Sequence, residues 1–127
     1  MSHHSVYKTD IKVDEKTLTR AIQKLADELG MKTRTHVSDA YGNITSVLIA
    51  LYSSELPRGI GFSIDSSGNL LIEGDSWRYE NKFAELSELA KNYINAYKTR
   101  MRVYQKFPNA RVKTKIRNRE VVMEVEI

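Results

Sequence analysis

The sequence predicts an α+β fold: a single antiparallel sheet with two helices, one short and one long, packed on one face, and a C-terminal β-hairpin. Three observations support this class. Short segments alternate apolar and polar residues as strands do, and two other segments repeat apolar residues at helical spacing. Turn residues join strand segments into two hairpins. A chain of 127 residues is long enough for one sizeable core, so we expect a single domain over residues 1–127.

The chain begins with a predicted strand and a short helix. Residues 5–13 alternate in polarity, as expected for a strand with one buried face. Asp14 is a suitable N-terminal cap for the helix that follows, and Gly30 is a suitable C-terminal stop. The apolar residues between them recur at helical spacing and define one face: Leu18, Ala21, Ile22, Leu25 and Leu29.

Two further strands and a connector are expected next. Residues 31–37 alternate in polarity, and residues 44–52 form the most apolar segment of the chain. Both are predicted strands, and the second is expected near the centre of the sheet. Residues 55–58 are expected to be a connector, because Pro57 lacks the N–H donor that a central strand needs.

A β-hairpin is predicted over residues 59–77. With Gly68 in the turn, Phe62 lies opposite Ile72, and both strands then have one apolar face. The other face is expected to be open to solvent, and it carries Gly59, Gly61, Ser63, Leu71, Glu73 and Asp75.

A long helix is predicted from about Glu80 to Phe107, closed by Pro108. Its early turns are rich in glutamate and its late turns in lysine and arginine, which complements the helix dipole. Apolar residues form one stripe along it: Phe83, Leu86, Ala90, Tyr93, Ile94, Tyr97, Met101 and Tyr104.

The last segment predicts a second hairpin with a two-residue turn at Asn118–Arg119. This register places Ile116 opposite Val121 and aligns basic residues with acidic ones on the other face. We expect the apolar side chains to be inside: Val112, Ile116, Val121, Met123 and Val125.

Composition limits the function classes. The absence of cysteine excludes disulfides and thiol chemistry and argues against a structural zinc site. No nucleophile elbow or phosphate-binding glycine loop is present, so we expect no cofactor and a non-enzymatic role. No segment approaches the ~18 consecutive apolar residues of a membrane span, and the N-terminal residues lack a signal peptide's apolar core. We therefore expect a cytoplasmic protein without a membrane partner.

Several short segments resemble a known family. They are Met-Ser-His at the start, residues 6–11, residues 25–30, residues 59–62 and residues 71–77, followed by a helix and a terminal hairpin. This pattern is similar to an uncharacterised hypothetical-protein family of cyanobacteria and algal plastids. The chain departs from it in the connector around Pro57 and in its more basic last helix. The resemblance implies a small soluble intracellular protein and assigns no catalytic or cofactor residue.

Three acidic residues are candidates for a metal site. Asp65, Glu73 and Asp75 lie on or near one predicted hairpin, with Glu73 and Asp75 on the same strand face. Carboxylates in this arrangement can hold Mg²⁺ or share a proton. The alternative is that they solubilise an exposed face.

The basic residues give a second candidate site. The net charge is +4, and residues 98–119 hold nine basic and no acidic residues. The predicted strand faces carry Lys32, Arg34 and His36 in one group, Arg111, Lys113, Lys115 and Arg117 in a second, and Lys8 and Lys12 in a third. If the helices cover the opposite side, these groups could share one open sheet face that attracts phosphates. The alternative is a solvated face that Glu120, Glu124 and Glu126 neutralise locally.

Three functions remain open at this stage. The first is a binding module whose basic sheet face contacts nucleic acid or an acidic protein. The second is an adaptor that forms a homodimer or joins a larger assembly through its open sheet and its edges. The third is a metal-dependent enzyme built on the three carboxylates.

Overall fold

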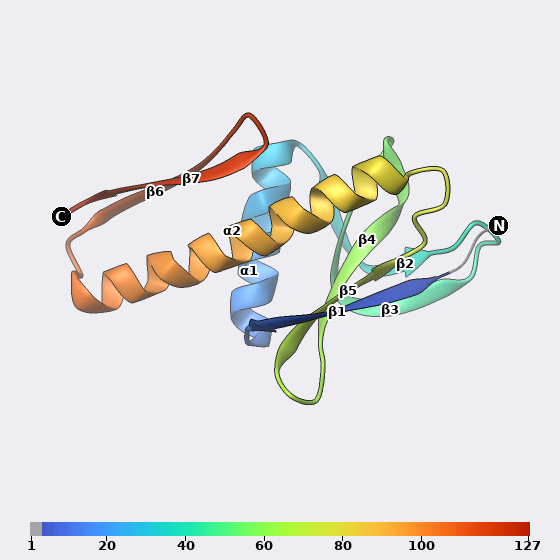
Figure 1. The fold of residues 1–127 in the computed structure, drawn as a ribbon, viewed down its shortest axis with the longest axis horizontal. Helices are drawn as coiled ribbons and strands as arrows, with labels where there is room; N and C mark the ends of the chain where they lie inside the picture. Colours follow the sequence, from blue (N-terminus) through green and yellow to red (C-terminus); the bar gives the residue numbers. More distant parts are fainter. Residues whose placement is uncertain (1–3) are drawn as a thin grey trace.

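The computed structural model describes residues 4–127, and within this range seven strands and two helices form an α+β fold, as predicted (Figure 1). The strands are β1 (Ser5–Lys12), β2 (Lys32–Ser38), β3 (Ile44–Ser53), β4 (Leu56–Ile64), β5 (Asn69–Gly74), β6 (Arg111–Arg117) and β7 (Glu120–Glu126). The helices are α1 (Glu15–Leu29) and α2 (Glu80–Lys106). The first five strands form an antiparallel sheet in the order β1-β5-β4-β3-β2, and β6 and β7 pair separately.

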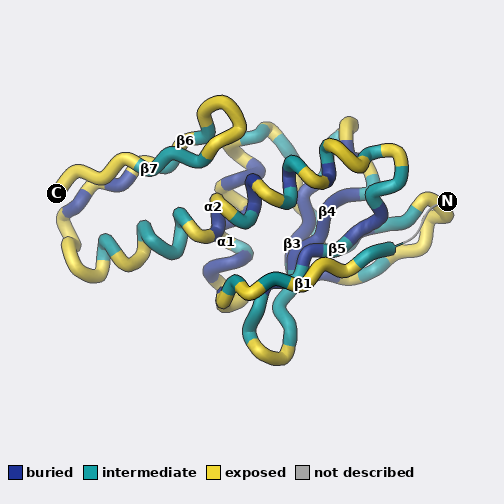
Figure 2. The backbone as a smooth tube through the Cα atoms, in the orientation of Figure 1, coloured by how far each residue is buried: buried dark blue, intermediate teal, exposed yellow. Residues whose placement is uncertain are grey.

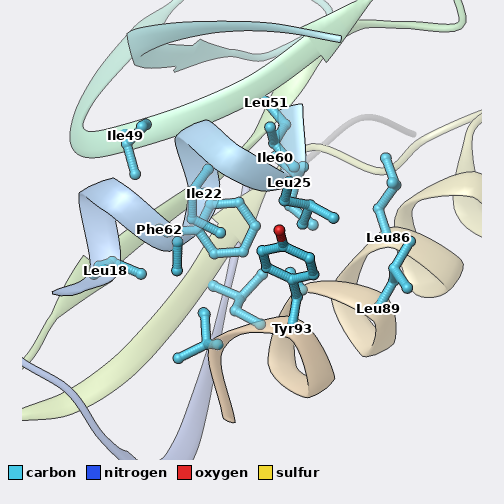
Figure 3. Close-up of a cluster of buried hydrophobic side chains, with 14 of the residues drawn as sticks. Leu18, Ile22, Leu25, Ile49, Leu51, Ile60, Phe62, Leu86, Leu89 and Tyr93 are labelled. Atoms are coloured by element: carbon cyan, nitrogen blue, oxygen red, sulfur yellow. The ribbon is translucent and has the colours of Figure 1, made fainter. Parts of the chain in front are cut away.

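The core lies between one face of the five-stranded sheet and the two helices. Figure 3 shows Phe62 and Ile60 of the sheet beside Leu25 of α1 and Tyr93 of α2. Side chains buried to this degree contribute about 1.5–3 kcal/mol each relative to leaving them exposed. Burial also raises the pKa of the Tyr93 hydroxyl above its ordinary value. The hydrophobic spacing that predicts the two helices therefore also identifies the face that each one buries.

The ends of α1 confirm the predicted caps. The Asp14 carboxylate accepts a hydrogen bond from the Thr17 backbone N–H at 2.7 Å. Gly30 ends the helix in the left-handed conformation, with φ of 65°, and its N–H donates back to the Asp27 carbonyl oxygen. Both ends are fixed by residues adjacent in sequence, which is why they are predictable from sequence.

The central hairpin has the predicted register, with Phe62 paired to Ile72, but the predicted connector before it is wrong. Strand β4 already begins at Leu56, which pairs with Ser53 across a tight turn. Pro57 is exposed at the second position of the strand, where its missing N–H costs no central hydrogen bond.

The face of the sheet opposite the helices is not open as expected. The register between β2 and β3 shifts between Arg34 and His36, an irregularity of the kind that bends strands. Strand β2 also contacts β4, although β3 lies between them in the sheet. Val37 and Val47 then pack over Gly61, where an added Cβ would lie 2.7 Å from Val47 Cγ1. Alternation of polar and apolar residues cannot reveal this bend. The bend arises where residues 47–49 of β3 lie opposite the single residue Thr35 of β2.

Helix α2 extends past the core. All of its buried residues lie between Glu80 and Ile94, and none lies in the remaining residues 95–106. Its second half continues beside the β6–β7 hairpin, and we call residues 95–127 the arm and residues 4–94 the body. Figure 2 shows that buried backbone is concentrated in the body, whereas most of the arm is half-buried or exposed.

The terminal hairpin confirms its predicted register and turn. Ile116 pairs with Val121, and Asn118 and Arg119 both have positive φ, as a two-residue turn of this type requires. The prediction that Val125 is inside is wrong, since 43% of it is exposed. Val125 pairs with Val112 at the end of the hairpin away from the turn, and α2 is the layer that faces these strands.

Candidate functional site

The basic residues predicted on β2 do not form a row of accessible cations. Lys32 is exposed, but the Arg34 guanidinium donates to the carbonyl oxygens of His36 at 3.0 Å and Pro57 at 2.9 Å. It also stacks on the Tyr52 ring, 4.3 Å from the centroid. His36 is half-buried. Arg34 therefore fastens the edge strand β2 to the start of β4.

The second predicted group lies on a different sheet. The side chains of β6 in this group are exposed on the outer face of the hairpin: Arg111, Lys113, Lys115 and Arg117. Their cross-strand partners on β7 are, in order, Glu126, Glu124, Val122 and Glu120. Arg117 also lies 3.6 Å from the Glu124 carboxylate. Acidic residues thus offset most of this charge, and the hairpin shares no sheet face with β2.

The three acidic candidates are separated in space. Asp65 accepts hydrogen bonds from two backbone N–H groups of the β4–β5 turn, which lower the pKa of its carboxyl. Glu73 lies 2.8 Å from His4 Nε2. Asp75, directly after β5, is 1% exposed. Within residues 4–127, no three His, Cys, Asp or Glu side chains lie close enough to hold a metal ion together.

Asp75 joins three segments of the body. Its Oδ2 accepts from the Ala40 N–H at 3.0 Å and lies 3.2 Å from Arg58 Nη1, while its Oδ1 accepts from the Trp77 N–H at 3.0 Å. Arg58 also donates to the Trp77 carbonyl oxygen and lies 5.0 Å from the Tyr79 ring centroid. Removing one partner of such a buried pair typically costs about 3–5 kcal/mol. These contacts indicate that the Asp75 carboxylate stabilises the fold by holding the three segments together.

A different set of cations converges where the body meets the arm. A groove of about 550 Å³ opens between the end of β1, the first turn of α1 and the second half of α2. Lys12, Lys98 and Arg102 line it, and we call it the basic groove. Lys98 and Arg102 are four residues apart and so share a helix face, a signal readable from sequence. Lys12 joins them through the tertiary fold, which sequence spacing does not reveal.

The two lysines of the basic groove are held in place but retain donors. The Lys98 ammonium donates to the Lys12 carbonyl oxygen at 2.5 Å, and the Lys12 ammonium donates to the Ser67 carbonyl oxygen at 2.6 Å. An ammonium group has three donors, so each lysine has further N–H groups for an anion. Arg102 is exposed beside them. The groove can therefore offer several charged donors to one anionic group.

One carboxylate also lines the basic groove. The hydrogen bond from the Thr17 backbone N–H holds the pKa of Asp14 below its ordinary value, so this group is negative at neutral pH. Asp14 offsets part of the positive charge and is already committed as the α1 cap. The groove keeps an excess of cations over anions.

Comparisons with known protein families, with characterised proteins and with solved structures found no match to this chain. The resemblance to the cyanobacterial and plastid family therefore stays a prediction. In the part of the chain that the structure describes, neither helix is long and apolar enough to cross a membrane.

Proposed function

We propose that this protein is a non-enzymatic nucleic-acid-binding module whose arm contacts phosphates, with the basic groove as the principal contact. The observation that carries this proposal is the separation of charge between arm and body. Residues 95–127 hold nine basic and three acidic residues, a formal charge of +6, whereas residues 1–94 hold eleven basic and thirteen acidic, a charge of −2. A surface of this kind attracts polyanions over distances near the Debye length.

The second half of α2 supplies a regular series of cations. Lys98, Arg102 and Lys106 recur every four residues, which separates them by about 6 Å along the helix axis. This spacing is comparable to that of successive phosphates along an extended single strand. Lys12 adds a further charge from the body at the basic groove. The series therefore favours contact with a phosphate backbone.

The lining of the basic groove favours phosphate over an acidic protein. Protein interfaces draw most of their affinity from an apolar, often aromatic, centre. The groove holds no aromatic side chain among the described residues, and its lining is mainly charged or polar, with Thr17 and Gln105 beside the cations. Charged donors of this type suit phosphate oxygens.

The proposal is tested by fluorescence anisotropy with a labelled single strand and a duplex of about 20 nucleotides, a length that exceeds the arm. The double variant Lys98→Glu/Arg102→Glu should bind at least tenfold more weakly near 50 mM salt. Four to five phosphates neutralised by the protein predict a slope of about −3.6 to −4.5 in log K against log salt for duplex. Each phosphate that the variant no longer neutralises should make this slope shallower by about 0.9.

The matched control is Lys113→Glu/Lys115→Glu, which makes the same change in charge on the outer face of the hairpin. Lys32→Glu tests the predicted β2 site in the same way. An equal loss of affinity in the hairpin variant would place the binding surface on the arm as a whole and contradict the basic groove. Absence of binding to both nucleic acids at low salt would refute the function.

The adaptor hypothesis is the second candidate, and one observation favours it. Both β1 and β2 are edges of the five-stranded sheet. Edge strands carry backbone groups that can pair with another chain, including a second copy in a homodimer. No arrangement among residues 4–127 favours the metal-dependent enzyme, because the three carboxylates lie apart.

A further inference from the structure

The edge strand β1 has a free side next to a groove. Among residues 4–127, β5 is the one strand bonded to β1, so the other side of β1 carries backbone N–H and C=O groups without a strand partner. Two of its side chains are unusually exposed for apolar residues, Val6 at 51% and Tyr7 at 46%. Such an edge is a template for pairing with another extended chain.

A groove of about 530 Å³ runs between this edge and the first half of α2, and we call it the strand groove. Tyr7, Lys8 and Thr9 form its β1 wall, and the buried side chain of Ile72 on β5 also lines it. The Tyr7 and Phe83 rings are in contact, with centroids 5.9 Å apart. The α2 wall is one helical stripe: Glu80, Phe83, Ala84, Ser87, Glu88 and Lys91.

The size of the strand groove matches a short extended segment. From Glu80 to Lys91 the helix rises about 16 Å, which an extended chain spans with about five residues. Ala84 and Ser87 are small, so they leave room beside Phe83 for side chains that enter from above the β1 edge. Alternate residues of an added strand would point into this space and the others toward solvent.

The charges along the strand groove differ at its two ends. Glu80 lies at the end near Tyr7, whereas Lys12 and Lys98 lie beyond the other end, where the Lys98 ammonium donates to the Lys12 carbonyl oxygen. The Lys91 ammonium lies 2.6 Å from the Glu88 carboxylate, so the charges of these two residues offset each other. A complementary segment would therefore be basic beside Glu80 and acidic beside Lys12.

We propose that the strand groove binds an extended segment of another polypeptide, which adds to β1 as an antiparallel strand with apolar residues beside Phe83. All strand pairs of this sheet are antiparallel, so the added segment runs from Lys12 toward Ser5. Its acidic residues then lie toward its N-terminal end and its basic residues toward its C-terminal end. This recognition combines main-chain pairing with side-chain pockets. The strand groove is lined by other residues than the basic groove, and the two surfaces meet only at Lys12, beside which the acidic end of the segment lies. The proposal does not depend on nucleic-acid binding.

The test uses a phage-displayed library of random twelve-residue peptides against the full chain. We expect enriched peptides with alternating apolar residues and acidic residues toward the N-terminus. A synthetic peptide of the enriched sequence should bind at least tenfold more weakly to Ala84→Trp, which fills the groove. Asn92→Trp, an exposed position on α2 outside the groove, should bind as the unaltered protein does. Ser87→Arg provides a second blocking variant if Ala84→Trp loses its circular dichroism signal.

A second measurement examines the main-chain pairing itself. Two versions of the peptide are compared, one N-methylated at its odd-numbered residues and one at its even-numbered residues. One version should lose binding and the other should keep it, because alternate N–H groups of a strand face its neighbour. No enrichment, equal binding by the blocking variants, or equal binding of the two methylated versions would overturn the proposal. A dimer in light scattering that Ala84→Trp converts to a monomer would also overturn it, since a second copy would then occupy the groove.

Discussion

The body and the arm share one helix but divide packing and charge between them. The body contains nearly all of the buried side chains and a formal charge of −2, whereas the arm has a charge of +6 and little buried surface. Among residues 95–127, which form the arm, the buried side chains are those of Ala110 and Val112. The contrast indicates that stability resides in the body, while the arm is free to carry charges that a packed core would not tolerate.

The largest expected effect comes from the centre of the body. Phe62 is fully buried between the sheet and both helices, so Phe62→Ala should lower the free energy of unfolding by about 3–5 kcal/mol. Val125→Ala in the arm should cost less than about 0.5 kcal/mol, in the range of surface substitutions. Urea unfolding of both variants measures the difference. Comparable losses of stability would mean that the arm is part of the core and that the division is wrong.

A moderate effect is expected where the sheet bends over itself. An added methyl at Gly61 meets Val47 and Val37, so Gly61→Ala should destabilise the body by about 1–3 kcal/mol through overpacking. Val47→Ala removes the nearest obstacle, and the same glycine substitution in that background should cost clearly less. A double-mutant cycle measured by thermal unfolding tests this coupling. Strictly additive effects would show that the valine does not cover Gly61.

The smallest effect concerns the α1 cap at the boundary of body and arm. Asp14→Ala should cost about 1 kcal/mol, because the Thr17 N–H loses its acceptor. The folded-state pKa of Asp14 lies below the unfolded value, so its ionic contribution is present above pH ~4 and is lost as pH falls through the folded pKa.

Asp14→Asn separates the cap from its charge. Asparagine also caps helices well, so this variant should keep most of the stability at neutral pH while losing the pH-dependent part. Denaturant midpoints measured between pH 3 and pH 7 provide the comparison. An unchanged pH dependence in Asp14→Asn would assign the acid sensitivity to other carboxylates, such as Asp39, Asp65 and Glu80, whose pKa values are also lowered.

Local features of this fold are predictable from sequence, and contacts between distant segments are not. The Asp14 and Gly30 caps and the Phe62–Ile72 and Ile116–Val121 registers depend on neighbours in the chain, and the structure confirms them. The bend that covers Gly61 depends on an irregular register between two other strands. Sequence alternation treats every strand as regular, so it predicted an open face that the structure does not have.

The candidate sites show the same limit. Residues of one predicted strand face need not be available for binding, because Arg34 is committed to backbone carbonyls of β2 and β4. The basic groove was missed because Lys12 and Lys98 come together from opposite parts of the chain. The charge imbalance of residues 98–119 was visible in sequence, but its placement on a separate arm required the structure.

Helix α2 is continuous, so it fixes the distance between the strand groove and the basic end of the helix in the arm. A helix rises about 1.5 Å per residue, so the end of the strand groove at Lys91 and the tip of the arm at Lys106 are held about 22 Å apart. Arg119 in the β6–β7 turn lies 3.5 Å from Glu85 of α2, which ties the hairpin back to the part of the helix that lies in the body. A polypeptide bound in the strand groove and a nucleic acid bound to the arm would therefore be held at a fixed distance and a fixed orientation relative to each other.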